Sequence, residues 1–152
     1  MNTNRQLGDK GKGLMTQAKK IHHVAFVVDS IEDSLSIWNV LGLKVEAIKD
    51  VPEQESRVAF LPLGDSKIEL VEPITASSGI ARYLEKRGPG MHHICIEVED
   101  ILGLLVILNE KGFRLINATP QVGTDGRKCV FIHPESTKGV LVELYELPVK
   151  KQ

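Results

Sequence analysis

The sequence predicts an α+β fold made of two βαβββ modules, whose strands form a curved mixed sheet around a metal cleft. Three observations predict this: an internal repeat, a strand followed by a helix in each copy, and a histidine and a glutamate at matching places in both copies. A length of 152 residues suits one domain or two small fused modules.

The repeat relates residues 21–45 to residues 91–115 without a gap. Identical residues fall in register at His22/His92, His23/His93, Val28/Val98, Ile31/Ile101, Leu35/Leu105, Ile37/Ile107, Asn39/Asn109 and Gly42/Gly112. Chance similarity between two amphipathic segments would not reproduce paired histidines and in-register glycines. We therefore interpret the chain as a duplicated module.

The first copy starts with a strand over 21–28. A helix follows, which Asp29 or Ser30 can cap and which Gly42 ends. Three short strands complete the copy, over 43–48, 56–63 and 67–72. The apolar residues of the helix recur at helical spacing: Ile31, Leu35, Trp38 and Leu41.

The second copy repeats this order. A strand over 91–98 precedes a helix that Asp100 caps and Gly112 ends, and the remaining strands are expected over 114–118, 128–133 and 140–147. Between the copies, Ser77 or Ser78 can cap a short connector helix that ends at Gly88. The predicted divisions are a disordered tail over 1–20, module one over 21–73, the connector over 74–90 and module two over 91–148.

Composition and charge argue against several classes of protein. Lys plus Arg (19) nearly balance Asp plus Glu (20), so the net charge of -1 gives no reason to expect nucleic acid or an anionic membrane as partner. No apolar run approaches the ~20 residues of a membrane helix, and the polar first residues do not resemble a secretory signal. Cys95 and Cys129 are too few for a disulfide scaffold. We expect a cytoplasmic protein.

Strand parity places one histidine and one glutamate of each module on the same face. Successive strand residues alternate between faces, so His23 and His93 lie opposite the larger apolar side chains that pack under the helices. In the last strand of each copy, Glu69 and Glu143 lie opposite their flanking apolar neighbours. If the sheets curl toward each other, these four side chains converge.

Two imidazoles and two carboxylates suit a catalytic divalent metal, with positions left for water or substrate. A lone histidine or glutamate in a strand is more often a packed or solvated residue, but recurrence in two modules favours a site. The expected metal ligands are His23, Glu69, His93 and Glu143. Cobalt, zinc, nickel and manganese all fit this set.

Nearby polar residues are expected to have other roles. Parity puts His22 and His92 on the opposite face, where we expect packing or hydrogen bonding rather than ligation. His133 falls at a strand end, where its strongest expected role is a substrate contact. Glu97 has Val27 as its counterpart in the first copy, so it is not expected to be a ligand.

These residues resemble the vicinal oxygen chelate superfamily, which includes glyoxalase I, extradiol dioxygenases and bleomycin-resistance proteins, and within it the methylmalonyl-CoA epimerases. The resemblance covers residues 21–148. Its motifs are IHHVA (21–25), VPEQ (51–54), KIELVEP (67–73), GMHHI (90–94), FIHP (131–134) and KGVLVEL (138–144).

The resemblance implies a glyoxalase-like fold and metal-dependent epimerisation of (R)- and (S)-methylmalonyl-CoA through a metal-stabilised enolate. Some epimerases place a catalytic glutamate shortly after the Pro-Glu-Gln turn, where this chain has Val58. Glu143, followed by Glu69, is therefore our candidate for the catalytic bases. The acyl-CoA substrate implies phosphate contacts, for which Arg127 and Lys128 are candidates.

Two other functions stay open at this point. A glyoxalase I-type lactoylglutathione lyase would use similar metal-enolate chemistry. Some epimerases carry glutamine at the position of Glu69, and a glyoxalase-type site would carry glutamate there, so this position does not separate the two functions. A non-catalytic binding protein of the bleomycin-resistance type would not need four intact ligands. An extradiol dioxygenase fits less well, because it uses two histidines and one carboxylate. We expect a homodimer, since the edges of open sheets invite pairing.

Overall fold

The protein is described by a computed structural model that covers residues 18–123 and 126–149. Its strands form one mixed sheet in the order β2-β3-β4-β1-β5-β8-β7-β6. The elements are β1 (Ala18–Val27), α1 (Ile31–Val40), β2 (Ala47–Val51), η1 (Pro52–Gln54), β3 (Ser56–Leu63), β4 (Ser66–Pro73), α2 (Gly79–Arg87), β5 (Gly90–Val98), α3 (Ile101–Glu110), β6 (Gln121–Val122), β7 (Lys128–Ile132), η2 (Pro134–Thr137) and β8 (Val142–Glu146). The predicted α+β class and the repeated βαβββ order are confirmed.

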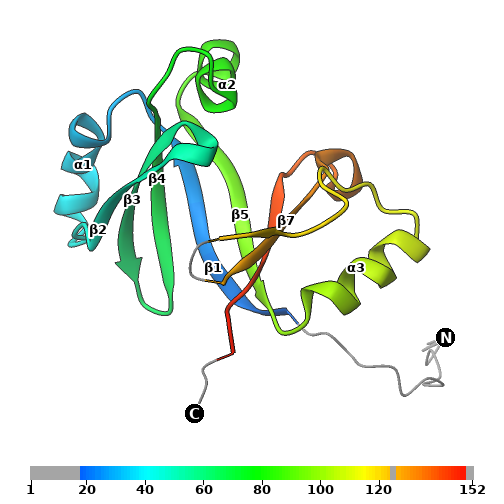
Figure 1. Cartoon of the computed structure of the whole chain (residues 1–152). Coiled ribbons are helices and arrows are strands. Elements are labelled where there is room, and N and C mark those ends of the chain that lie inside the picture. The colour runs from blue at the N-terminus through cyan, green and yellow to red at the C-terminus, as the bar shows by residue number, and fades with distance from the viewer. Residues whose placement is uncertain (1–17, 124–125, 150–152) are drawn as a thin grey trace, which may run out of the picture.

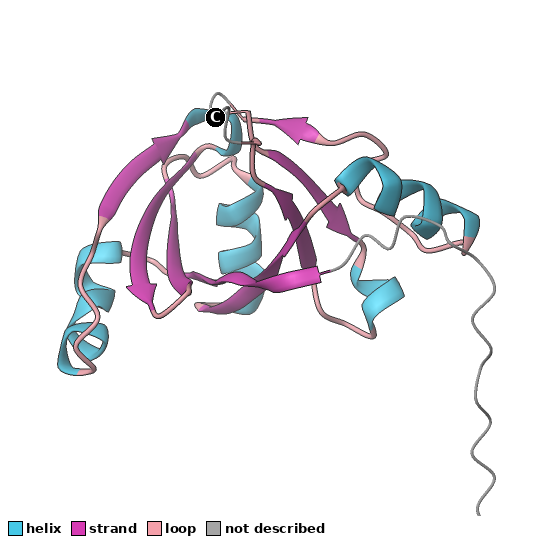
Figure 2. Cartoon of the chain, turned by 90° about the horizontal axis from the view of Figure 1, so that it is seen from below, coloured by secondary structure: helices cyan, strands magenta, loops and turns pink. Residues whose placement is uncertain are grey.

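The two first strands of the modules form the centre of the sheet. β1 pairs antiparallel with β5, and each is flanked by the parallel last strand of its own module, β4 beside β1 and β8 beside β5. Figure 2 shows the strands as an arch, and Figure 1 places α1 and α3 at opposite ends of the molecule. The sheet is therefore a curled half barrel in which equivalent strands of the two modules meet at the middle.

Each module has its own apolar core between its helix and one face of the sheet. In module one, Ile31 of α1 packs with Leu61 and Leu70, and in module two Ile101 of α3 packs with Val130 and Leu144. The repeat aligns Ile31 with Ile101, and the other four residues lie in the strands that follow each helix. The histidine-bearing face is left free of these helices, as parity predicts for His23 and His93.

Serine and aspartate cap the helices as expected. Ser30 Oγ accepts from the backbone N–H of Asp33 in α1, Ser78 Oγ from Ala81 in α2, and Asp100 Oδ1 from Gly103 in α3. Within the described residues, no helix has the length and apolar character needed to cross a membrane.

The strand boundaries differ from expectation in three places. β1 begins at Ala18, which pairs with Val98, so order starts before residue 21; residues 1–17 of the expected tail lie outside the described part. The segments 43–46 and 114–118 are not continuous strands, and β2 and β6 begin only at Ala47 and Gln121.

The helix ends explain the two late strands. Gly42 and Gly112 adopt left-handed backbone conformations (φ 85° and 73°), and the N–H groups of Leu43 and Phe113 donate back to the carbonyls of Trp38 and Leu108. These are glycine-dependent capping turns. They use the residues directly after each glycine to close the helix, so the next strand starts further along the chain.

Candidate metal and active site

Four titratable side chains meet at the centre of the sheet, on the face opposite the helix cores. They lie on four adjacent strands: Glu69 on β4, His23 on β1, His93 on β5 and Glu143 on β8. His23 Nε2 lies 2.8 Å from Glu69 Oε2, 3.3 Å from Glu143 Oε2 and 3.1 Å from His93 Nε2, and His93 Nε2 lies 3.1 Å from Glu143 Oε2. The structure thus brings together all four residues that the sequence predicted as metal ligands.

The spacing of these atoms fits a transition-metal site. Bonds of about 2.0–2.2 Å at angles between square and tetrahedral place neighbouring ligand atoms roughly 2.8–3.6 Å apart, and the four distances above fall in that range. The ligand atoms of His23, His93 and Glu143 all lie within 4.8 Å of one another. The side chains are buried and two carboxylates offset a divalent charge, so the chemistry of the donor set also fits.

Burial and hydrogen bonding work against each other in this cluster. Burial alone would lower the pKa of His23, but hydrogen bonds to Glu143 and Glu69 outweigh it and raise the pKa to about 9. Burial alone would raise the pKa of Glu143, but hydrogen bonds from His23 and His93 lower it to about 2. At neutral pH Glu143 is therefore ionised, and a metal entering the cluster has to displace the proton on His23.

His22 and His92 do not lie on the face that parity predicted. The pairing of β1 with β5 shifts register between Ile21 and His23, and again opposite His92, so each histidine pair contains a β-bulge. The extra residue turns both imidazoles toward the same side: His22 Nδ1 is 2.9 Å from His23 Nδ1, and His92 Nδ1 is 2.9 Å from His93 Nδ1. The predicted opposite-face position was wrong, and the predicted hydrogen-bonding role is what the geometry shows.

The imidazoles of His22 and His92 are neutral at physiological pH. Burial, followed by the neighbouring charge of His23, lowers the pKa of His22 to about 4, and burial, followed by that of His93, lowers the pKa of His92 to about 4. Each ring also packs on a tyrosine, with centroids 4.5 Å apart for His22 and Tyr145 and 4.7 Å apart for His92 and Tyr83.

The ligand atoms of a second group, His22, His23 and Cys95, also lie within 4.8 Å of one another. A cysteine binds metal as thiolate, and burial together with the charges of Glu143 and Glu69 raises the pKa of the Cys95 thiol. Nδ1 of His22 is already directed at the ring of His23. The four-residue cluster is therefore the better candidate.

One wall beside the cluster is apolar. On the side of module one, Ala25, Val58 and Val71 form an apolar patch, against which Ile80 of α2 packs. Val58 is only 4% exposed. The position where some epimerases carry a glutamate is thus part of an apolar wall here.

Aromatic rings flank the two central histidines. Phe60 and Phe131 occupy equivalent positions, each paired across its ladder with the glutamate of its own module. Their ring centroids lie 6.5 Å from that of His23 and 5.6 Å from that of His93. Sequence reasoning missed these residues, although both sit at the same place in their respective strands.

A hollow of about 460 Å³ opens beside the cluster, and His22, Phe60 and Tyr145 form its inner wall. Its cationic lining consists of Lys49, Lys67 and Arg127, with Glu46 as the acidic member; Ala47 and Leu147 complete it. Lys67 Nζ donates to Glu46 (2.8 Å), and Arg127 donates to the Tyr145 hydroxyl. Lys128, the other expected phosphate contact, instead pairs with Glu146 at 2.8 Å.

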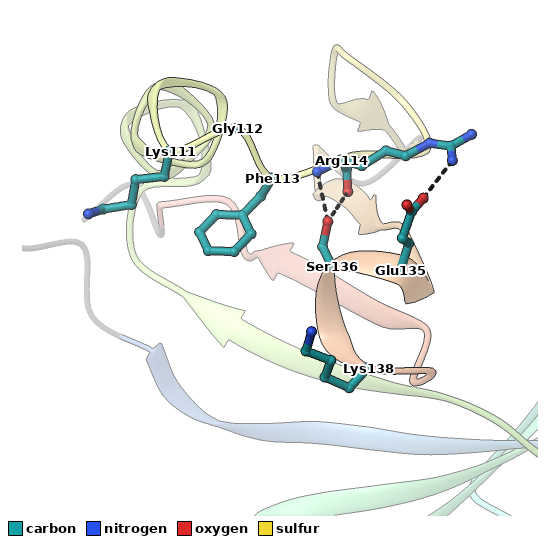
Figure 3. A pocket seen from close by; sticks show the side chains of 7 residues that line it. All are labelled: Lys111, Gly112, Phe113, Arg114, Glu135, Ser136 and Lys138. Carbon is teal, nitrogen blue, oxygen red and sulfur yellow. Dashed lines mark hydrogen bonds and ion pairs between the residues drawn. The ribbon is translucent and has the colours of Figure 1, made fainter.

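A second hollow, of about 390 Å³, lies at the end of α3 and contains none of the clustered residues. Figure 3 shows Arg114 paired with Glu135 there, while Ser136 bonds the Arg114 backbone. His133 lies at the neighbouring turn, where its Nδ1 accepts from the Glu135 N–H. Glu97 is buried, and its carboxylate oxygens lie 3.8 Å from Lys19 Nζ and 4.0 Å from Lys20 Nζ.

Comparisons with known proteins agree with this arrangement. A family model described as the glyoxalase/bleomycin resistance protein/dioxygenase superfamily matches residues 22–131. The ethylmalonyl-CoA/methylmalonyl-CoA epimerase of Cereibacter sphaeroides is 40% identical over 84% of this chain and 98% of that protein. The mitochondrial methylmalonyl-CoA epimerase of Bos taurus is 38% identical over 88% of this chain and 78% of its own length.

Solved structures give the same result. The methylmalonyl-CoA epimerase of Mycobacterium tuberculosis superposes with a TM-score of 0.81 and 30% identity, covering 90% of this chain and 93% of that one. A Streptomyces coelicolor methylmalonyl-CoA epimerase variant in complex with 2-nitronate-propionyl-CoA superposes with a TM-score of 0.79 and 26% identity, covering 90% and 99%.

Proposed function

The chain belongs to the methylmalonyl-CoA epimerase family of the glyoxalase/bleomycin resistance/dioxygenase superfamily, and we propose that it interconverts (R)- and (S)-methylmalonyl-CoA. The observation that carries the proposal is the row Glu69, His23, His93, Glu143 across four adjacent strands, beside a hollow with cationic residues. The enzyme is an isomerase that works with one divalent metal in this cluster.

His23, Glu69, His93 and Glu143 would hold the ion. When bound, a divalent ion supplies Lewis acidity toward the thioester carbonyl and the free carboxylate of the substrate, which lowers the cost of removing the C2 proton. An ion that accepts six ligands would have two further positions for the substrate oxygens. Cobalt, zinc, nickel and manganese remain the candidates.

Glu143 and Glu69 are the proposed groups that move the proton. They flank the two histidines from opposite sides, Glu69 from β4 and Glu143 from β8. In the proposed reaction one group enters as carboxylate and the other as carboxylic acid. The C2–H bond breaks as the carboxylate takes the proton, the thioester becomes an enolate, and the acid gives its proton to the opposite face of C2, so that the two groups exchange protonation states. A positioned base contributes ~10²–10⁴-fold. Val58 offers no alternative, because its side chain is aliphatic.

The apolar and basic parts of the site suit the two ends of an acyl-CoA. Ala25, Val58 and Val71 offer a dry surface for the methyl group. Lys49, Lys67 and Arg127 exceed the single acidic residue of the hollow, Glu46, by two charges at neutral pH, which suits phosphate groups.

The substitution Lys49→Gln tests the basic part of the hollow. It should raise KM for the CoA ester while leaving the kinetics of the pantetheine thioester, which lacks the adenosine phosphates, unchanged. Lys44→Gln, outside the hollow, is the control. An equal change in KM for both substrates would exclude phosphate contact by Lys49.

Solvent exchange tests the proposed reaction. Metal-loaded protein in D₂O should introduce deuterium at C2 of methylmalonyl-CoA and interconvert the two epimers. The same preparation should form no lactoylglutathione from methylglyoxal and glutathione. The reverse pattern would establish the glyoxalase reaction instead, and binding without either reaction would establish a binding protein. The homodimer and the cytoplasmic location expected from the sequence stay predictions.

A further inference from the structure

The two proposed histidine ligands, His23 and His93, each contact the preceding histidine in the same way. Each ligand directs Nε2 to the shared centre, where the two Nε2 atoms are 3.1 Å apart, and directs Nδ1 away from it. In each case Nδ1 meets Nδ1 of the preceding histidine at 2.9 Å. The support is therefore duplicated along with the ligands.

From this geometry we infer that His22 and His92 are positioning residues, which accept the Nδ1–H of His23 and His93 and thereby keep each Nε2 bare and aimed at the metal. The inference rests on the proposed metal site. A ligating imidazole has to present an unprotonated nitrogen, and the hydrogen bond at its other nitrogen decides which one that is. An acceptor held opposite Nδ1 selects the tautomer with the hydrogen on Nδ1.

The backbone shows why this contact forms between sequence neighbours. In a regular strand, adjacent side chains point to opposite faces and their rings cannot meet. Two of the three register shifts in the β1–β5 pairing fall at the histidine pairs, one in each module, and remove that alternation there. The ring centroids of both pairs are 5.2 Å apart at near-perpendicular orientations of 79° and 78°.

Tyrosine rings fix the supporting histidines in turn. The chain has two tyrosines, and each packs on one of these rings: Tyr145 of β8 on His22 and Tyr83 of α2 on His92. The Tyr83 hydroxyl donates to the Met91 carbonyl (3.1 Å), so its ring is held as well. Both supporting imidazoles are thus packed from a second element and cannot easily turn away.

A matched pair of substitutions separates hydrogen bonding from packing. Oδ1 of asparagine stands where Nδ1 of histidine stands and is only an acceptor, whereas leucine has similar size and no acceptor. The variants are His22→Asn, His22→Leu, His92→Asn and His92→Leu, with His133→Leu as a control on an imidazole outside the cluster. Full-length protein stripped of metal is titrated with Co²⁺, and the visible absorption of the bound ion is recorded.

The leucine variants should bind Co²⁺ about 10–100-fold more weakly, with altered absorption bands, as expected when a supporting hydrogen bond to a metal ligand is lost. The asparagine variants and His133→Leu should keep wild-type affinity and spectra. Thermal unfolding of the metal-free proteins shows whether packing alone has changed.

Two results would overturn the inference on its own: leucine variants with wild-type Co²⁺ binding, or asparagine and leucine variants that lose affinity equally. A wild-type protein that takes up no Co²⁺ would instead refute the proposed metal site, and the positioning role with it. The wild-type titration therefore distinguishes the two failures before any variant is compared.

Discussion

At the scale of single residues, the two carboxylates of the site differ in their contacts with the histidine ligands. Glu143 contacts both histidine ligands, whereas Glu69 contacts His23 at 2.8 Å. Glu143 is therefore the more tightly held of the two. Its ionised state at neutral pH is the one that a proton acceptor needs.

The substitution Glu143→Gln tests the assignment of the base. The amide keeps the size of the side chain and one oxygen for a metal but cannot take a proton, so kcat should fall about 10²–10⁴-fold while much of the Co²⁺ affinity remains. Deuterium exchange at C2 and Co²⁺ titration measure the two effects. Glu85→Gln, on the exposed side of α2, is the control. Near-normal turnover of Glu143→Gln would remove Glu143 from the mechanism.

Cys129 gives a prediction about pH. Burial, followed by the charge of Glu143, raises the pKa of its thiol from the ordinary 9.0 to about 11. Alkylation requires thiolate, so at pH 8 the native protein should react about 10²-fold more slowly at Cys129 than the urea-unfolded chain, since the pKa differs by about two units.

Ionisation and access can be separated by the pH profile of the Cys129 reaction. The alkylation rate of the native protein should keep rising up to about pH 11, beyond the point where that of the unfolded chain levels off near pH 9. The same shift should lower the stability of the fold as pH rises above 9, because the unfolded state then releases this proton more readily. A native profile that levels off at pH 9 would contradict the assigned pKa.

At the scale of elements, the first helix residue of each module donates a hydrogen bond to the strand that carries the glutamate of that module. Glu72, three residues after Glu69, accepts from the N–H of Ile31 at the start of α1 (2.7 Å). Glu146, three residues after Glu143, accepts from the N–H of Ile101 at the start of α3, also at 2.7 Å. A carboxylate at a helix N-terminus is favoured by both the free N–H groups and the helix dipole.

Glu72→Gln and Glu146→Gln should each lower the free energy of unfolding, by about 0.5–1 kcal/mol. The loss at Glu146 should be the larger, because that residue also pairs with Lys128 (2.8 Å). Urea unfolding of the metal-free proteins measures both, with Glu85→Gln as the comparison. If neither variant differs from Glu85→Gln, the two carboxylates do not stabilise the helices.

The elements also show what the sequence could and could not predict. Repetition and helical spacing predicted the modules, and period-two alternation put His23, Glu69, His93 and Glu143 on one face. The same alternation failed for His22 and His92, because a bulge inserts one residue into a strand and no feature of the sequence marked its position. The contacts of Glu72 and Glu146 were not predicted either, since they join segments that only the folded topology brings together.

At the scale of the whole molecule, the cluster joins the two modules. The two helix cores do not share their buried residues, and each module supplies one histidine and one glutamate to the centre. Metal binding should therefore add an interaction across the β1–β5 seam that neither module has alone. An ion that binds only the folded arrangement stabilises it by mass action.

Metal removal tests this role. At a free concentration of about 100 times its Kd, Co²⁺ should stabilise the fold by about 2.7 kcal/mol, which corresponds to a Tm higher by roughly 5–11 °C for a chain of this size. Differential scanning calorimetry on chelator-treated protein, before and after Co²⁺ is added, measures the shift. Ca²⁺, which prefers sites made only of oxygen ligands, should shift Tm much less. His23→Ala should abolish the response to Co²⁺, because it removes the ligand that contacts the other three; an undiminished Co²⁺ response in that variant would place the bound ion elsewhere.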